Sequence, residues 1–245
     1  MAGNGMPKAK HTRARTHRNG VRSEHFEEDI LHAAEVLFES KGYAQTSMSA
    51  IARAVGIDQS SLYYWFSSKD DLLEAMLEKS NLPMRFADVS APGVNVAAYL
   101  YALSYRDTYN LCTMPVDYFE LEQAATRNRE RFEGYFTKYR QFAQAISFAI
   151  DRGCAQGELI CADSEVGALS FLLVDEGVQH RFHQNKKGFD PFDGFGRTDS
   201  GTLDVSRHAH VAARDCLSMF VERFDSIELA RSTAQQAGWL DMEQG

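Results

Sequence analysis

The 245-residue sequence lacks the features of several protein classes. No apolar run approaches the ~18 residues that a membrane span needs. The longest runs, near 143–150 and 167–174, have the length of buried helix stripes, and the N-terminus lacks the apolar stretch of a signal peptide. The 4 cysteines show no CxxC spacing. These absences predict a cytoplasmic protein with no membrane partner, whose cysteines are reduced and buried.

Signatures of catalysis and of bound cofactors are also missing. The sequence has no GxSxG, Walker loop or GxGxxG motif, so we expect no enzyme activity and no cofactor. His180 with His183, and His208 with His210, occur as close pairs. Zinc could bridge such pairs in principle, but His208 and His210 would not share one helical face. We therefore predict no metal site.

Strand signals are nearly absent, whereas apolar residues recur at three- and four-residue steps along most of the chain. This pattern predicts an all-α protein. We expect a basic arm over 1–22, a small helical domain over 23–80 and a larger helical domain over 81–245. In the larger domain, helices are predicted at about 94–112, 115–127, 129–153, 163–184 and 205–224, with a weaker one at about 226–237 and a glycine-rich loop at 185–204.

The small domain is predicted to contain four helices. The first runs from about 24 to 41, with Ser23 as its N-cap. Two short helices follow, "SMSAIARAV" and "DQSSLYYWF", and a tight turn at Gly56 joins them. Two short helices joined in this way are a helix-turn-helix. Ser68 and Asp71 match the Ser-x-x-acid capping pattern that opens the fourth helix. In the larger domain, Gly153 and Gly157 are expected to end a helix.

The third helix carries four consecutive aromatic residues, "YYWF", at 63–66. Four consecutive helical side chains point in four directions, so one core cannot bury them all. Leu62 and Phe66 lie four residues apart and should face the core. The remaining polar and planar side chains can hydrogen-bond to bases or phosphates in a major groove; they are Gln59, Ser60, Tyr63 and Tyr64. The alternative is a surface helix whose Tyr and Trp are half-buried against a neighbour.

The stretch "TSMSAIARAVGIDQSSLYYWFSSKDDLLEAML", with the preceding "AAEVLFESKGY", resembles the N-terminal domain of the tetracycline-repressor (TetR/AcrR) family of bacterial regulators. Many positions agree in order and spacing over roughly 26–78. The resemblance implies a homodimeric repressor that binds a palindromic double-stranded DNA operator and is released by a small-molecule effector. It implies base or sugar-phosphate contacts for Gln59, Ser60, Ser61 and Tyr64 and phosphate contacts for Thr46, Ser47, Tyr63 and Lys69, while Trp65 either touches the DNA backbone or packs.

Residues 94–184 are rich in aromatic side chains, most of which are expected to form core. Buried tyrosines need a partner for the hydroxyl, and an aromatic cavity with a few polar groups suits a small, mostly apolar or aromatic molecule. Asp175 interrupts the apolar run "GALSFLLV", and we expect it to be one of these polar groups. The alternatives are that Asp175 forms a buried ion pair or lies on the surface as a solvated carboxylate. The predicted effector-binding residues are Tyr101, Tyr105, Phe119, Tyr139, Phe142, Phe171 and Asp175.

Helices 163–184 and 205–224 are predicted to form the dimer interface. Gly167, Ala168 and Gly177 would let helices approach closely, and two helices from each subunit would form a four-helix bundle. The second helix places apolar residues at helical spacing, namely Val211, Ala212, Cys216, Met219 and Phe220. The alternative is burial within one subunit.

The competing function is a small-molecule carrier or an enzyme built on the larger domain, with the helix-turn-helix as a docking module.

The net charge of −8 hides an asymmetry. Residues 1–22 carry 6 basic and no acidic side chains, whereas residues 23–245 carry 20 basic and 34 acidic ones. Residues 23–80 hold 4 basic against 11 acidic residues, a weak electrostatic attraction for a DNA-binding unit. We infer that the basic arm lies along the DNA and supplies much of the phosphate attraction. A solvated tail is the alternative.

Deleting residues 1–22 is expected to weaken operator binding and to flatten its salt dependence, because each lost phosphate contact lowers the slope of log K against log[salt] by about 0.9. Titrations of full-length and truncated protein at several salt concentrations measure both quantities. An unchanged affinity and slope would show that the arm does not contact DNA.

Overall fold

The computed structural model describes residues 20–80, 87–191 and 196–242, and within these residues the only regular elements are ten helices. The predicted all-α fold is therefore confirmed. Four helices form an N-terminal head: α1 (Gly20–Lys41), α2 (Met48–Val55), α3 (Gln59–Trp65) and α4 (Lys69–Ser80). Six form the larger body: α5 (Val96–Thr113), α6 (Tyr118–Thr126), α7 (Glu133–Ala155), α8 (Ser164–Lys186), α9 (Val205–Ser218) and α10 (Phe224–Gln236).

Local signals fix most helix ends in the head. Helix α1 stops at Lys41 because Gly42 adopts a left-handed backbone with φ 79°. Ser47 caps α2 by accepting a hydrogen bond from the Ala50 N–H, and Gly56, with φ 78°, ends it. Helix α1 begins at Gly20, so Ser23 lies inside the helix and the prediction that it is the N-cap was wrong.

The connection between α3 and α4 follows the predicted capping pattern. The Asp71 N–H donates to Ser68 Oγ at 3.1 Å, and the Ser68 hydroxyl donates back to Asp71 Oδ1 at 2.9 Å. The Ser67 N–H donates to Asp71 Oδ2 at 3.0 Å. These bonds satisfy N–H groups that the start of α4 would otherwise leave without partners.

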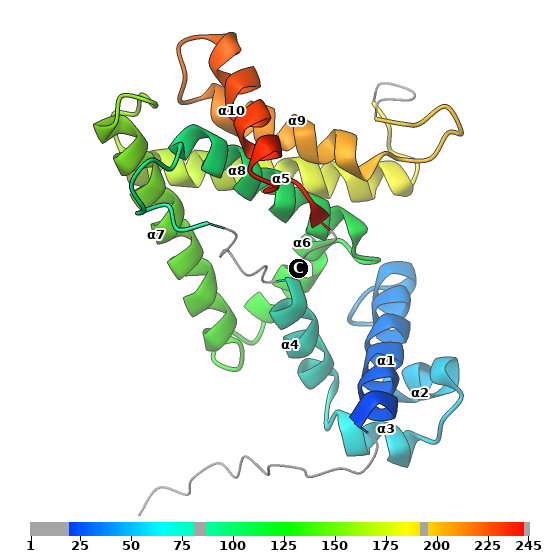
Figure 1. Cartoon of the computed structure of the whole chain (residues 1–245). Helices are drawn as coiled ribbons and strands as arrows, with labels where there is room; N and C mark the ends of the chain where they lie inside the picture. The colour runs from blue at the N-terminus through cyan, green and yellow to red at the C-terminus, as the bar shows by residue number, and fades with distance from the viewer. Residues whose placement is uncertain (1–19, 81–86, 192–195, 243–245) are drawn as a thin grey trace, which may run out of the picture.

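Helix α5 is the centre of the body (Figure 1). Thirteen of its 18 residues are buried, which one apolar stripe cannot achieve, so other helices must cover it on several sides. Helices α7, α8, α9 and α10 all pack against it. Helices α8 and α9 run across the top of the molecule in this view, and the head lies below, with α6 between. None of the described helices is long and apolar enough to cross a membrane.

Two predictions about the body need correction, and a third is confirmed. Helix α9 ends at Ser218, not near 224, because the chain turns there and the Phe220 carbonyl accepts a hydrogen bond from Ile160 N at 2.8 Å. The weak last helix is real, and α10 packs on α5 through its buried positions Ile227, Ala230 and Ala234. Of the four free cysteines, Cys112 and Cys216 are buried, whereas Cys154 and Cys161 are only partly so.

Two apolar cores run through the described residues. One fills the body around α5, and the other fills the head. The head core also contains side chains of the body, among them Leu121 of α6 and the neighbouring pair Phe132 and Tyr135. Four side chains of α4 are each at most 1% exposed: Leu72, Leu73, Met76 and Leu77. They give α4 two adjacent apolar stripes, which pack against α1 on one side and against α6 and α7 on the other.

Gly153 lies inside α7 and does not end it as predicted. A Cβ at this position would lie 2.5 Å from Leu159 Cδ1 and 3.2 Å from Val96 Cγ1, so the glycine lets α7 approach the start of α5 closely. Gly134, near the start of the same helix, has no atom within 4 Å of such a Cβ. The two positions form a matched pair.

Gly153→Ala is expected to destabilise the protein by about 1–3 kcal/mol, because the added methyl overpacks the contact. Gly134→Ala should be neutral or stabilising by up to about 1 kcal/mol, because alanine favours a helix. Urea unfolding of both variants and wild type measures the difference. Equal stability of the two variants would contradict this close packing.

Candidate nucleic-acid interface and interior polar site

Helix α3 is held to the head by one face. Leu62 is fully buried and Phe66 is 6% exposed, as the spacing predicted. Tyr63 and Tyr64 are 45% and 52% exposed, and Gln59, Ser60 and Ser61 are also exposed. The predicted polar residues of α3 therefore form a continuous surface that is free of the head core. Contact of this surface with DNA remains a prediction.

Trp65 packs between α1 and α3. Its ring centroid lies 5.9 Å from that of Phe26 on α1 and 5.8 Å from that of Tyr64, which it meets edge to face. Trp65 is thus half-buried and joins α3 to α1, while Tyr64 stands over it. Gln59 Nε2 lies 3.3 Å from the Tyr63 hydroxyl, one turn along α3. Around the rings of Phe26, Tyr64 and Trp65 the surface forms a shallow hollow, which is also lined by Ile57, Ser60 and Ser61.

Two of the predicted phosphate-binding side chains are already engaged. Thr46 is 3% exposed, and its hydroxyl lies 3.0 Å from the Gly42 carbonyl and 3.2 Å from that of Leu37. Lys69 Nζ donates to the Tyr43 carbonyl at 2.6 Å and to the Thr46 carbonyl at 2.9 Å. A phosphate contact by either group would require breaking these bonds. Ser47, by contrast, is exposed at the N-terminus of α2.

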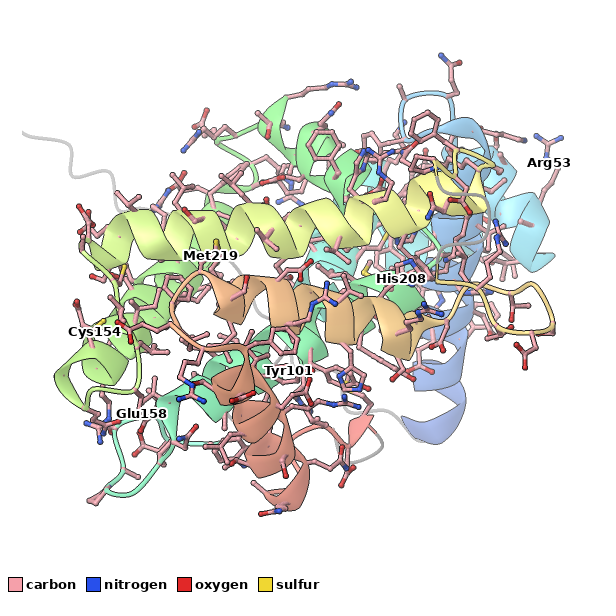
Figure 2. The ribbon with its side chains drawn as sticks, turned by 90° about the horizontal axis from the view of Figure 1, so that it is seen from above. Arg53, Tyr101, Cys154, Glu158, His208 and Met219 are labelled. Atoms are coloured by element: carbon pink, nitrogen blue, oxygen red, sulfur yellow. The ribbon has the colours of Figure 1, made fainter. Side chains whose placement is uncertain are left out.

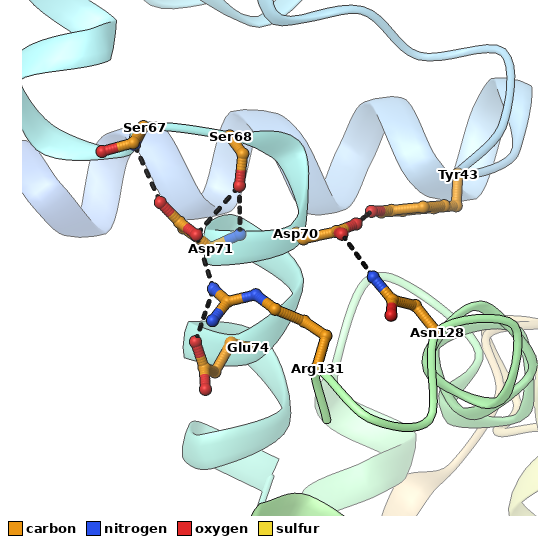
Figure 3. Close-up of polar contacts among 8 residues, drawn as sticks. All are labelled: Tyr43, Ser67, Ser68, Asp70, Asp71, Glu74, Asn128 and Arg131. Carbon is orange, nitrogen blue, oxygen red and sulfur yellow. Dashed lines mark hydrogen bonds and ion pairs between the residues drawn. The ribbon is translucent and has the colours of Figure 1, made fainter. Parts of the chain in front are cut away.

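A polar network ties the head to the body (Figure 3). Arg131, in the connection between α6 and α7, forms ion pairs with Asp71 at 2.6 Å and Glu74 at 2.9 Å. Asn128 donates to Asp70 at 3.3 Å, and Asp70 also accepts the Tyr43 hydroxyl. Each pair is partly exposed and is worth at most about 1 kcal/mol. Together they fix how α4 sits against the body.

A second link reaches α1. Lys187, which follows α8, lies 2.9 Å from Glu120 of α6 and 3.6 Å from Glu39 of α1. Hydrogen bonding to Glu120 and the charges of both carboxylates raise the pKa of Lys187 against the opposing effect of burial. The lysine stays charged and joins three helices at the junction of head and body.

The hydroxyls of the predicted effector-binding tyrosines have partners on different helices. The Tyr101 hydroxyl lies 2.9 Å from His210 Nδ1, and the Tyr105 hydroxyl lies 3.1 Å from Ser206 Oγ, so both tyrosines reach α9. Burial raises the pKa of Tyr101 to about 12. Tyr139 donates instead to Glu176 on α8. Phe171 is 1% exposed and packs in the body core with the half-buried Phe142. Phe119, by contrast, is 44% exposed and lies against the His180 ring.

Asp175 is the predicted residue whose surroundings are most informative. It is 2% exposed, and its Oδ1 accepts the hydroxyl of Thr108 at 2.9 Å and that of Ser104. The neighbouring Asp107 carboxyl interacts with it, and burial raises the pKa of both groups. Asp175 is therefore neither a surface carboxylate nor half of an ion pair with a described lysine or arginine.

Asp175 begins a polar stripe that the sequence analysis missed. Gln179 and His183 follow at intervals of four residues on the buried face of α8, and they are 1% and 0% exposed. On α5, Ser104 and Thr108 show the same four-residue interval. The signal was present in the sequence, because polar residues at i and i+4 on otherwise apolar helices fall on one face.

The histidines have separate partners. His180 Nδ1 lies 2.7 Å from Asp117 Oδ2, and His183 Nε2 lies 3.1 Å from the Leu111 carbonyl. His208 Nδ1 lies 2.7 Å from the Asp204 carbonyl. Within the described part of the chain, no three His, Cys, Asp or Glu side chains converge as metal ligands do.

The outer face of α8 is apolar and exposed. Val166, Leu169 and Leu173 are 59%, 57% and 61% exposed, and Met219, just after α9, is 39% exposed. Figure 2 looks onto α8 and α9, which lie side by side on this face, with Met219 at the end of α9. The buried positions on these helices pack within the subunit, among them Ala212, Cys216 and Phe220 of the predicted interface.

The role predicted for Gly167 also changes. A Cβ there would lie 2.9 Å from Cys161 Sγ and 3.0 Å from Phe220 Cε1, so this glycine permits close packing inside the subunit. Gly177, in contrast, is open and lies on the exposed side of α8. The predicted set of small residues therefore divides between the two faces of the helix.

Comparisons with known proteins agree with this arrangement. The model for "Bacterial regulatory proteins, tetR family" matches residues 30–76, which span α2, α3 and most of α1 and α4. The chain is 28% identical over 158 residues to the HTH-type transcriptional regulator YfiR of Bacillus subtilis (strain 168), covering 61% of this chain and 76% of YfiR.

Solved structures share the whole fold. AmtR of Mycobacterium smegmatis superposes with a TM-score of 0.61 at 23% identity, covering 86% of this chain and 94% of AmtR. AibR, solved with isovaleryl coenzyme A and operator DNA, gives 0.55 at 22% identity, covering 77% and 96%. SmeT, a repressor of a Stenotrophomonas maltophilia efflux pump, gives 0.55 at 21%, covering 80% and 90%. The helix-turn-helix head thus matches the model for bacterial regulatory proteins of the tetR family, and the all-helical body shares the fold of these solved structures.

Proposed function

We propose that the protein is a homodimeric, cytoplasmic repressor that binds a palindromic operator and leaves it when a small molecule binds the body. The observation that carries this proposal is the division of α3. Leu62 and Phe66 anchor the helix, and its opposite face presents exposed amide, hydroxyl and phenol groups to solvent. Such groups read base edges and phosphates when a helix enters the major groove.

The proposed DNA-binding surface follows from exposure. Gln59, Ser60, Ser61 and Tyr64 would contact bases or sugar, and Tyr63 and the exposed Ser47 would contact phosphate. Arg53 of α2 is exposed and projects from the edge of the head (Figure 2), so it adds a positive charge near this surface. Thr46 and Lys69 would act indirectly, because their bonds hold the loop between α1 and α2 in place.

The proposed dimer uses the exposed apolar face of α8. Val166, Leu169 and Leu173 follow at three- and four-residue steps, so they lie along one stripe of the helix. A single subunit leaves this stripe in water, which is unfavourable by roughly 25 cal/mol per Å² of apolar surface. Met219 extends the stripe toward α9. A second copy of the chain would bury both stripes around a twofold axis.

The proposed switch acts through α4. This helix shares a core with α6 and α7 and is held by Arg131, so a shift of the body helices moves the head. An effector that binds the DNA-incompetent arrangement more tightly shifts the equilibrium by its differential affinity. The effector is proposed to be a small, mostly apolar or aromatic molecule. AibR, which shares the fold, was solved with a coenzyme A thioester and operator DNA.

Tyr64→Ala is expected to weaken operator binding by about 1–3 kcal/mol per half-site, since the exposed ring and hydroxyl would be lost from the interface. Footprinting and gel shifts with the DNA upstream of the chain's own reading frame measure this. A palindromic footprint in wild type supports the proposal, and no sequence-specific binding defeats it.

Phe224→Ala serves as the control, since Phe224 is 63% exposed on α10, away from the head. Its operator affinity should match wild type, and both variants should keep the wild-type circular dichroism spectrum. Full affinity in Tyr64→Ala would show that the DNA-facing side of α3 is assigned wrongly.

Leu173→Glu is expected to convert the dimer to a monomer, because the apolar contact across the twofold axis would then bury two like charges. Leu229→Glu is the matched control, since Leu229 is 65% exposed on α10 and is the same residue type. Sedimentation velocity reads the oligomeric state. A monomeric Leu229→Glu with a dimeric Leu173→Glu would place the interface on α10 instead.

A further inference from the structure

The body holds four carboxyl groups, contributed by three helices, whose charges act on one another. Asp107 lies on α5, Glu122 on α6, and Asp175 and Glu176 on α8. Asp107 interacts with Asp175, and Glu122 with Glu176. No lysine or arginine among the described residues forms an ion pair with any of the four. Carboxylates gathered inside a protein without a cation are unfavourable unless a positive partner or protons join them.

Buried hydrogen-bond acceptors follow along the same face of α8. Gln179 Oε1 has no hydrogen-bond donor among the described residues, although its side chain is 1% exposed, and the only group that can donate to Asp175 Oδ2 there is a protonated Asp107. His183 donates through Nε2 to the Leu111 carbonyl, which leaves Nδ1 as an acceptor without a partner. Buried polar atoms are normally satisfied. Gln179 Oε1 and His183 Nδ1, on one face of α8, therefore call for donors that the described residues do not supply.

Tyrosines border this acidic region on the side of α6 and α7. The hydroxyls of Tyr118 and Tyr135 hydrogen-bond to each other, and Tyr139 donates to Glu176. The charges of Glu122 and Glu176 both act on Tyr135. Aromatic faces attract cations in addition to apolar groups. The region thus combines negative charge, unpaired acceptors and aromatic rings.

We propose that the acidic region between α5, α6, α7 and α8 binds the positively charged, hydrogen-bond-donating end of the effector, so that the effector is an apolar or aromatic molecule carrying a protonated amine. This inference rests on the proposed function, whose effector it makes more specific. Asp175 receives the ammonium group together with Gln179, and the tyrosines contact the apolar part. The site lies beside Tyr135 and α6, which belong to the core shared with the head.

An alternative account is that protons alone neutralise the cluster. Burial raises the pKa of Asp107, Asp175, Glu122 and Glu176, so the acids can share protons when no cation is present. That account predicts no preference for amines over neutral analogues, because no group in the region would seek a cation. The two accounts therefore differ in a measurement that does not involve DNA.

The test compares two matched pairs of probes on the full-length protein: 2-phenylethylamine with 2-phenylethanol, and octylamine with octanol. Calorimetry and thermal shift measure binding at pH 7.5, where both amines are charged. The amines are expected to bind about tenfold or more tightly than the alcohols, which is the contribution typical of hydrogen bonds to charged groups. Equal affinity within each pair, or no saturable binding of either amine, would overturn the proposal and leave water or protons as the occupants.

Asp175→Asn is the diagnostic variant. Its amide oxygen can still accept from Ser104 and Thr108, and removing a buried charge should leave the thermal midpoint unchanged or higher. The amine preference should fall about tenfold, while the alcohols bind as before. Asp151→Asn, at an exposed position on α7, is the control and should keep the full preference. Equal loss in both variants, or none in Asp175→Asn, would also overturn the proposal.

Operator binding is measured on the same preparations without probe. A chain that binds its operator but shows no amine preference loses this inference alone. A chain that prefers amines through Asp175 but binds no operator keeps the site and loses the proposed repressor function.

Discussion

The packing of α4 is the constraint on which the rest of the structure depends. Its two apolar stripes are almost fully buried, one toward α1 and the other toward α6 and α7. The core of the head is therefore continuous with the body, which contributes side chains such as Leu121, Phe132 and Tyr135 to it. Burying one such leucine stabilises the fold by about 1.5–3 kcal/mol. Movement of α6 and α7 cannot leave the head unaffected, because a packed core is not continuously deformable.

Polar contacts restrict the orientation of the head at this apolar interface with the body. Arg131, Asn128 and Lys187 connect the body to carboxylates on α1 and α4 at several points around the junction. Individually these partly exposed pairs contribute little free energy. Their separate positions restrict rotation of the head about α4, which an apolar contact alone would allow. The acidity of the head outside α3 thus has a structural use, since Asp70, Asp71 and Glu74 accept these bonds.

The interior of the body differs from a simple apolar cavity. Polar side chains recur at four-residue intervals on α5 and α8, where an amphipathic helix would present only apolar groups. A fold selected for stability alone would replace such a stripe with hydrophobic residues at little or no cost. The stripe reaches the core that the body shares with the head, because His183 bonds the Leu111 carbonyl and Leu111 belongs to that core. The packing around the stripe and the position of α4 are therefore physically linked.

Local sequence determined what local physics can determine. Gly42, Gly56, Ser47 and Ser68 set helix ends through backbone geometry and capping bonds that involve only neighbouring residues. The four-residue interval of Leu62 and Phe66 fixed the face of α3, because helical periodicity alone decides it. Only the tertiary structure decided the partners of groups distant in sequence. It directed Thr46 and Lys69 inward, and it gave Tyr101 and Tyr105 partners on α9 and Asp175 partners on α5. It also placed Gly167 in a tightly packed contact and Gly177 in open space, although both lie on α8. Which face of a buried helix meets which neighbour depends on how the ten described helices pack together.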